Sequence, residues 1–178
     1  MGIIFKKVLL KEKFVKKFIK ETLFFIIIFI IATSIIGYIR SANTNENALN
    51  LLKNYKTIDN KDISMLIKNK ILVLNFWGTW CPICKQEIYN ISNLSKKDDF
   101  IIVTIAYNSG EDKDIKEFLK QKKVNFYVVN DKDGKITKAF KISTFPTTIF
   151  YSKDRKKVIK DSGYISTAGF LARVKGVK

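Results

Sequence analysis

The two cysteines of this 178-residue chain, Cys81 and Cys84, are its only ones, and they lie three positions apart. An apolar run typical of a buried strand, residues 71–76, precedes them, and Pro82 suits the first turn of a following helix. At a helix start, unpaired N–H groups and the helix dipole favour a thiolate. The second cysteine, one turn later, lies on the same face. We therefore predict redox chemistry, with Cys81 as the nucleophile and Cys84 as the resolving thiol.

Composition removes the metal and nucleic-acid alternatives. The chain has no histidine, which excludes Cys/His zinc sites and histidine-based acid–base catalysis, and a single C-x-x-C cannot complete a four-cysteine zinc site. As a structural staple, a disulfide over this spacing would restrain the unfolded chain little. The net charge of +17 comes mainly from scattered lysines, without an RNA-binding aromatic motif or an arginine cluster. We expect no metal, no nucleic acid and no cofactor other than the redox-active disulfide Cys81–Cys84.

The N-terminal segment has the pattern of a membrane anchor. Residues 22–39 carry no charge and are close to the length that crosses the hydrocarbon core as a helix. Seven lysines and two acids precede them, which predicts a cytoplasmic leader at residues 1–21 and export of the rest. A cleaved signal peptide is disfavoured because the apolar run is long and Arg40 spoils the nearest cleavage site; a buried core helix is the other alternative. We predict a single-pass anchor in the inner (plasma) membrane, in contact with lipid, and a periplasmic or otherwise extracytoplasmic catalytic domain.

The rest of the chain alternates strand and helix patterns. Short apolar runs predict strands at residues 71–76, 100–105, 126–129, 147–151 and 157–160. Capping signals and apolar spacing predict helices from Pro82, from residues 111–112, over 136–140 and over 167–174. This order predicts an α/β domain with a mixed sheet covered on both faces, over residues 55–178. The asparagine-rich residues 40–54 are predicted to be a tether, with a short helix around residues 49–52.

Two stretches resemble a known family. ILVLNFWGTWCPICKQE, residues 71–87, resembles the thioredoxin superfamily, and most of all its membrane-tethered TlpA/ResA/DsbE-type members. Phe145-Pro146-Thr147 is similar to the family's cis-proline loop, and residues 106–130 resemble the strand–helix insertion of the TlpA-like group. The resemblance covers residues 55–178 and implies a three-layer thioredoxin-like fold with this insertion, preceded by the transmembrane helix.

The resemblance also implies a substrate-binding groove beside the cysteines. Pro146 would be cis, and the backbone of Phe145 would pair with an extended substrate segment and place its disulfide over Cys81. Trp77 and Trp80 would border the groove, with core packing as the alternative for each. We therefore expect these four residues around the groove to bind substrate.

Two further positions bear on the acidity of the cysteines. Asn75 stands where thioredoxin itself has a buried aspartate that shuttles protons, and an asparagine cannot titrate. Glu87 matches the glutamate of the ResA-like C-x-x-C-x-x-E pattern, and it lies one helical turn after Cys84. The resemblance implies that Glu87 tunes the cysteines; a surface glutamate on a helix is the alternative.

The activity implied is that of a membrane-tethered thiol–disulfide oxidoreductase acting on exported proteins. Reduction is the direction expected, with apocytochrome c as a substrate during cytochrome c maturation. A membrane electron donor or acceptor is then needed, because the chain has no second cysteine pair. One alternative is a protein disulfide oxidase or a ScsD-like protein of copper or stress tolerance. Another is a peptide-binding module with idle cysteines. A peroxidase is disfavoured because paired cysteines flanked by tryptophan differ from the usual peroxidatic site.

Overall fold

The computed structural model describes residues 19–32 and 46–178. Residues 19–32 form a helix, and within these two ranges no helix is both long and apolar enough to cross a membrane. Of the predicted leader and anchor, residues 1–18 and 33–39 lie outside the described residues. The chain divides into two compact units, Met1–Arg40 and Ser41–Lys178. Both cysteines belong to the second unit.

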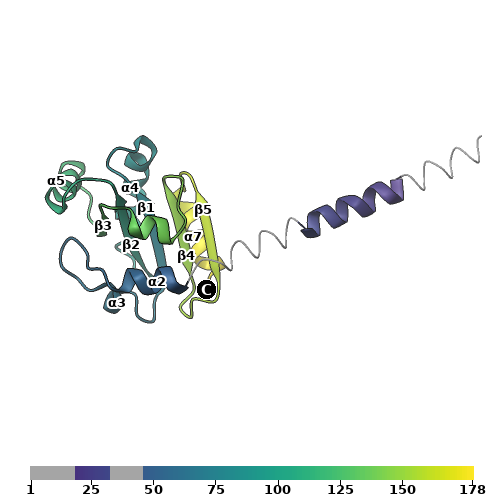
Figure 1. The fold of residues 1–178 in the computed structure, drawn as a ribbon, viewed down its shortest axis with the longest axis horizontal. Coiled ribbons are helices and arrows are strands. Elements are labelled where there is room, and N and C mark those ends of the chain that lie inside the picture. Colours follow the sequence, from purple (N-terminus) through teal and green to yellow (C-terminus); the bar gives the residue numbers. More distant parts are fainter. Residues whose placement is uncertain (1–18, 33–45) are drawn as a thin grey trace, which may run out of the picture. The chain divides into compact units, whose positions relative to one another are not determined.

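One mixed sheet of five strands forms the centre of the second unit, in the order β3-β2-β1-β4-β5 (Figure 1). Its strands are β1 (Ile71–Trp77), β2 (Phe100–Tyr107), β3 (Tyr127–Asp131), β4 (Thr147–Tyr151) and β5 (Val158–Ser162). The central strand β1 is parallel to β2 and antiparallel to β4. At the edges, β3 is parallel to β2 and β5 is antiparallel to β4. The predicted mixed sheet is therefore confirmed.

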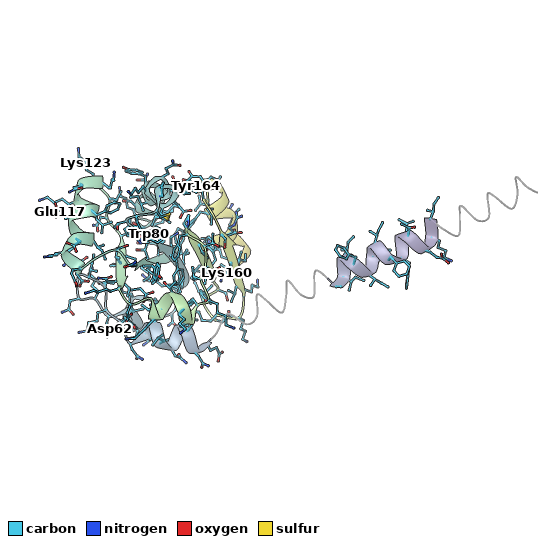
Figure 2. All side chains as sticks on the ribbon, turned by 45° about the horizontal axis from the view of Figure 1, so that its top comes forward. Asp62, Trp80, Glu117, Lys123, Lys160 and Tyr164 are labelled. Carbon is cyan, nitrogen blue, oxygen red and sulfur yellow. A yellow bond between two sulfur atoms is a disulfide. The ribbon has the colours of Figure 1, made fainter. Side chains whose placement is uncertain are left out.

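The helices lie in two layers on opposite faces of this sheet. They are α2 (Glu46–Lys53), α3 (Ile63–Leu66), α4 (Pro82–Leu94), α5 (Asp112–Lys122), α6 (Lys135–Ala139) and α7 (Thr167–Gly176). One hydrophobic core joins the sheet to α4, α5 and α7, and a second joins it to α2, α3 and α6. Side chains fill the space between the helices and the sheet (Figure 2). The expected cover on both faces is confirmed.

Alternate residues of β1 belong to the two different cores. Ile71, Val73 and Trp77 belong to the core that includes α4, whereas Leu72 and Leu74 belong to the other. Every residue of β1 is buried. A strand with both faces covered has no solvent side, which explains why its sequence is a continuous apolar run rather than an alternating one.

The domain begins earlier than residue 55. Helix α2 occupies residues that the sequence placed in the tether, and it buries Ala48, Leu49 and Leu52 in the second core. The spacing of these three residues gives the short helix one apolar side. The four-residue α3 was not expected, because it is too short to show an apolar period; Asp62 caps it by accepting a hydrogen bond from the backbone N–H of Ser64.

The segment between the second and third strands contains a crossover helix. Helix α5 begins with a capping box between Glu111 and Asp114, as expected from the acids at its start. It buries Ile115 and Leu119 and leads into β3, which lies beside β2 at the sheet edge. Helix α5 and most of β3 thus lie in residues 106–130, the segment that resembles the TlpA-type insertion.

Candidate active site

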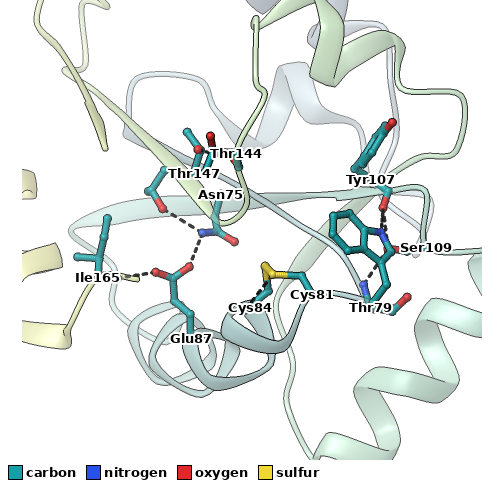
Figure 3. The surroundings of a disulfide bond; sticks show 12 residues. Asn75, Thr79, Cys81, Cys84, Glu87, Tyr107, Ser109, Thr144, Thr147 and Ile165 are labelled. Atoms are coloured by element: carbon teal, nitrogen blue, oxygen red, sulfur yellow. Dashed lines mark hydrogen bonds between the residues drawn. A yellow bond between two sulfur atoms is a disulfide. The ribbon is translucent and has the colours of Figure 1, made fainter. Parts of the chain in front are cut away.

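Cys81 and Cys84 form a disulfide at the start of α4 (Figure 3). The chain leaves β1 at Trp77, turns, and enters the helix with Cys81 as the N-cap and Pro82 in the first turn. The sulfur of Cys81 accepts a hydrogen bond from the backbone N–H of Cys84, with 3.2 Å between nitrogen and sulfur. Both cysteines are buried. The predicted position of Cys81 at a helix start is confirmed, and a thiolate there is favoured by the same N–H group and by the helix dipole.

The loop before β4 contains the expected cis-proline. The peptide bond between Phe145 and Pro146 is cis, which confirms the prediction from the resemblance. Phe145 packs against the core that contains both cysteines and makes an edge-on ring contact with Trp80, with centroids 5.4 Å apart. The Trp80 side chain is 49% exposed. Trp80 and Phe145 therefore form an apolar surface beside the disulfide, where a substrate-binding role stays a prediction.

Trp77 does not border a groove, contrary to the expectation. It is 1% exposed and packs against the rings of Phe118 and Phe126, with centroid distances of 5.6 and 6.0 Å. The reason is its place at the end of β1, on the face that packs against α4 and α5. Trp77 is a core residue, and Trp80, three positions later in the turn, is the exposed tryptophan of the motif.

A phenylalanine substitution tests this assignment of the two tryptophans. Trp77→Phe removes part of a buried ring system and leaves a cavity, so we expect the free energy of unfolding to fall by about 1–2 kcal/mol. The rate of thiol–disulfide exchange should stay within about twofold of the wild type, because no exposed surface changes. Denaturant unfolding and an exchange assay measure the two quantities. A large loss of exchange in a stably folded variant would contradict the core assignment.

Glu87 is buried, so the alternative of a surface glutamate is wrong. Its side chain is 2% exposed and accepts two hydrogen bonds, from the backbone N–H of Ile165 at 2.8 Å and from Asn75 Nδ2 at 2.9 Å (Figure 3). Burial raises the pKa of Glu87, and the two hydrogen bonds oppose that rise because they stabilise the carboxylate. Glu87 follows Cys84 by one helical turn, so a buried carboxyl group lies close to the resolving cysteine.

Asn75 connects three elements of the site. Its Nδ2 donates to Glu87 on α4 and also to Thr148 Oγ1 on β4, at 2.9 Å in both cases. Asn75 cannot titrate, and the buried acid to which it donates, Glu87, lies on α4. Thr148 was not predicted as part of the site. The only sequence feature that pointed to Thr148 was the pair of threonines, Thr147 and Thr148, at the start of the otherwise apolar strand β4.

Two residues that hydrogen-bond to the turn before the cysteines, Tyr107 and Ser109, were also missed. The backbone oxygen of Tyr107 accepts a hydrogen bond from Trp80 Nε1 at 3.1 Å, and the Ser109 hydroxyl accepts one from the Thr79 N–H at 3.0 Å. They lie at and just after the end of β2, far from the cysteines in sequence. No motif marked them. In residues 19–32 and 46–178, no group of three or more His, Cys, Asp or Glu side chains could hold a metal ion.

This arrangement suits thiol–disulfide exchange. The sulfur at the helix N-terminus can act as a nucleophile, and the second sulfur, one turn away, can act as a resolving thiol. The buried acid can act as a proton acceptor, and the cis-proline loop completes the arrangement. On a mixed sheet covered on both faces, they define a thioredoxin-like thiol–disulfide oxidoreductase.

Comparisons with known proteins agree with this class. The model of the AhpC/TSA family matches residues 45–161, more than half of the chain, and the chain belongs to that family. A thioredoxin-like protein of Haemophilus influenzae is 28% identical over 160 residues, which are 90% of this chain and 95% of that protein. The thiol-disulfide oxidoreductase ResA of Bacillus subtilis is 39% identical over 95 residues, but these are only 52% of either protein. The chain thus spans about half the length of that relative.

The fold agrees with solved structures. The crystal structure of StoA from Bacillus subtilis superposes with a TM-score of 0.59 and 26% identity, over 68% of this chain and 93% of StoA. A sporulation thiol-disulfide oxidoreductase of the same organism is 31% identical over 103 residues, 62% of its length. ResA and the sporulation protein are thiol-disulfide oxidoreductases, and this chain has the cysteine pair that such activity requires.

Proposed function

We propose that this protein is a membrane-tethered oxidoreductase that reduces disulfides of exported proteins, with the cysteines of apocytochrome c as its substrate. The observation that carries the proposal is the buried Glu87 one helical turn after the Cys81–Cys84 pair. It completes the C-x-x-C-x-x-E pattern that resembles ResA-type proteins, and it gives the resolving cysteine a nearby proton acceptor. The likeness to ResA of Bacillus subtilis, a thiol-disulfide oxidoreductase, supports thiol–disulfide exchange as the reaction.

The proposed reaction moves two electrons from the protein to its substrate. In the reduced protein, the Cys81 thiolate attacks one sulfur of the substrate disulfide, and the other substrate sulfur leaves as a thiolate. Cys84 then gives its proton to the Glu87 carboxylate and attacks the Cys81 sulfur. The mixed disulfide breaks, and Cys81 and Cys84 end as the disulfide. The two substrate sulfurs leave as thiolates and become a dithiol by taking the proton back from Glu87 and a second proton from water. A membrane electron donor must reduce the pair again, because the chain has no other cysteine.

The proposed location is the outer side of the inner (plasma) membrane. The uncharged residues 22–39 would be the anchor, and the lysine-rich leader before them would stay in the cytoplasm. A reporter enzyme active only outside the cytoplasm, fused after residue 178, should be active, and the protein should remain in the membrane fraction after salt washing. Release of the protein into the soluble fraction would contradict the anchor.

Trapping in cells tests the direction of electron flow and the substrate. In a Cys84→Ser strain, we expect mixed disulfides that contain apocytochrome c, and in wild-type cells we expect the Cys81–Cys84 pair to be mainly reduced. Thiol-specific alkylation followed by mass spectrometry measures both. If the wild-type pair is mainly oxidised, and the only proteins trapped are exported proteins that are still folding, the result would instead identify a disulfide oxidase. A deletion strain that is sensitive to copper but has normal cytochromes would identify a stress-tolerance protein.

A further inference from the structure

The exposed indole of Trp80 is held by the end of β2 rather than by its own loop. Trp80 Nε1 donates to the backbone oxygen of Tyr107 at 3.1 Å. The Ser109 hydroxyl donates to the same oxygen at 3.0 Å and accepts from the Thr79 N–H at 3.0 Å. One buried serine therefore joins the backbone just before Trp80 to the carbonyl that holds the Trp80 ring.

Ring contacts fix the other side of the indole. The Trp80 ring meets Phe145 edge-on, and Phe145 lies flat on the ring of Tyr107, with 5.2 Å between centroids and 7° between planes. Phe145 immediately precedes the cis-proline. The three rings thus connect the cysteine turn, the end of β2 and the cis-proline loop beside the disulfide.

Glycine at position 78 is required by the same arrangement. A Cβ atom there would lie 2.5 Å from Trp80 Nε1, closer than any allowed contact. The indole is a rigid ring held by Tyr107 and Phe145, so it cannot move aside without losing the hydrogen bond or the ring contact. Gly78 therefore leaves free the space that the indole occupies.

We propose that Ser109 is a positioning residue that holds Trp80 as one wall of the surface on which a protein substrate lies while Cys81 attacks its disulfide. This inference rests on the proposed function and adds the segment after β2 to the substrate-binding surface. Both cysteines are buried, whereas Trp80, the residue before Cys81, is half exposed. We therefore expect a polypeptide whose disulfide reaches Cys81 to contact the indole. A small-molecule disulfide, which has no polypeptide around it, does not contact the indole, so its reaction should not depend on how Trp80 is oriented.

A comparison of two disulfides tests this role in the full-length protein. The probes are the disulfide-linked dimer of a short cysteine peptide with apolar flanking residues, and the small disulfide hydroxyethyl disulfide. Ser109→Ala should lower the second-order rate constant with the peptide about tenfold, the scale of one lost hydrogen bond, and leave that with the small disulfide unchanged. Ser109→Thr keeps the hydroxyl and should restore the peptide rate.

Ser92→Ala is the matched control. Ser92 is also buried, and its hydroxyl accepts from the backbone N–H of Asn125, on the loop before β3. Its loss should reduce stability without changing the ratio of the two rate constants. An equal ratio in Ser109→Ala and the wild type would overturn the positioning role. A wild-type protein that reacts with neither probe would overturn the proposed function itself.

The indole N–H signals in an NMR spectrum provide a second readout. The Trp80 signal should shift and exchange faster with water in Ser109→Ala, while that of Trp77, whose Nε1 has no partner within the described part of the chain, should stay in place. Gly78→Ala should displace the same Trp80 signal and lower the same peptide rate, which keeps the test decisive if Ser109→Ala folds poorly. An unmoved Trp80 signal in both variants would contradict the inference.

Discussion

Replacing Cys84 with serine is expected to leave Cys81 covalently joined to its substrate, whereas replacing Cys81 with serine should abolish exchange. Cys81 caps α4 and accepts the N–H of Cys84, which favours its thiolate, so it attacks first. Cys84 then resolves the mixed disulfide within the same molecule. Intramolecular attack has effective concentrations of about 10⁵ M or more, so without Cys84 substrate release by millimolar external thiol should slow by about 10⁸-fold.

Non-reducing electrophoresis and mass spectrometry of the purified variants measure both outcomes. Cys84→Ser should give a stable adduct with a peptide disulfide, through Cys81, and Cys81→Ser should give none. The double variant is the control for nonspecific capture. The reverse result, an adduct only in Cys81→Ser, would assign the nucleophile to Cys84 and contradict the roles derived from the helix start.

The residues that the sequence could locate are those whose role depends on local spacing. Cys81 and Pro82 lie where a strand pattern changes into a helix pattern, and helix ends follow from a few neighbouring residues. The cis state of Pro146 followed from the resemblance of a three-residue stretch. In each case the determining contacts come from residues that are close in the sequence.

The misassigned and missed residues depend on contacts across the fold. Trp77 lies on the same side of β1 as Ile71 and Val73. It is buried because α5 and the loop before β3 place the rings of Phe118 and Phe126 against it. Ser109 is separated from Thr79 by 30 positions and has no repeated pattern around it. The burial of Glu87 likewise depends on Ile165, which closes over it from the loop before α7.

Replacing Glu87 with glutamine is expected to slow resolution of the mixed disulfide about 100-fold at neutral pH, the usual scale of a lost general base. The amide keeps the size of the side chain but cannot take the proton of Cys84, while the first attack by Cys81 should remain near its wild-type rate. Rapid-quench measurement of the mixed disulfide separates the two steps. Glu117→Gln, on the exposed side of α5, is the matched control because it removes an acid far from the site.

The pH dependence of stability gives an independent check on Glu87. Burial raises its pKa above the ordinary value of about 4.3, so the folded protein binds the proton more tightly than the unfolded chain does. The resulting stabilisation is complete below the unfolded pKa and is lost as the pH rises through the higher folded pKa. Glu87→Gln cannot titrate, so its unfolding free energy should not show this fall across that window. A variant with the wild-type pH dependence and the wild-type resolution rate would show that Glu87 only fills space, and that Cys84 loses its proton to water or to another base.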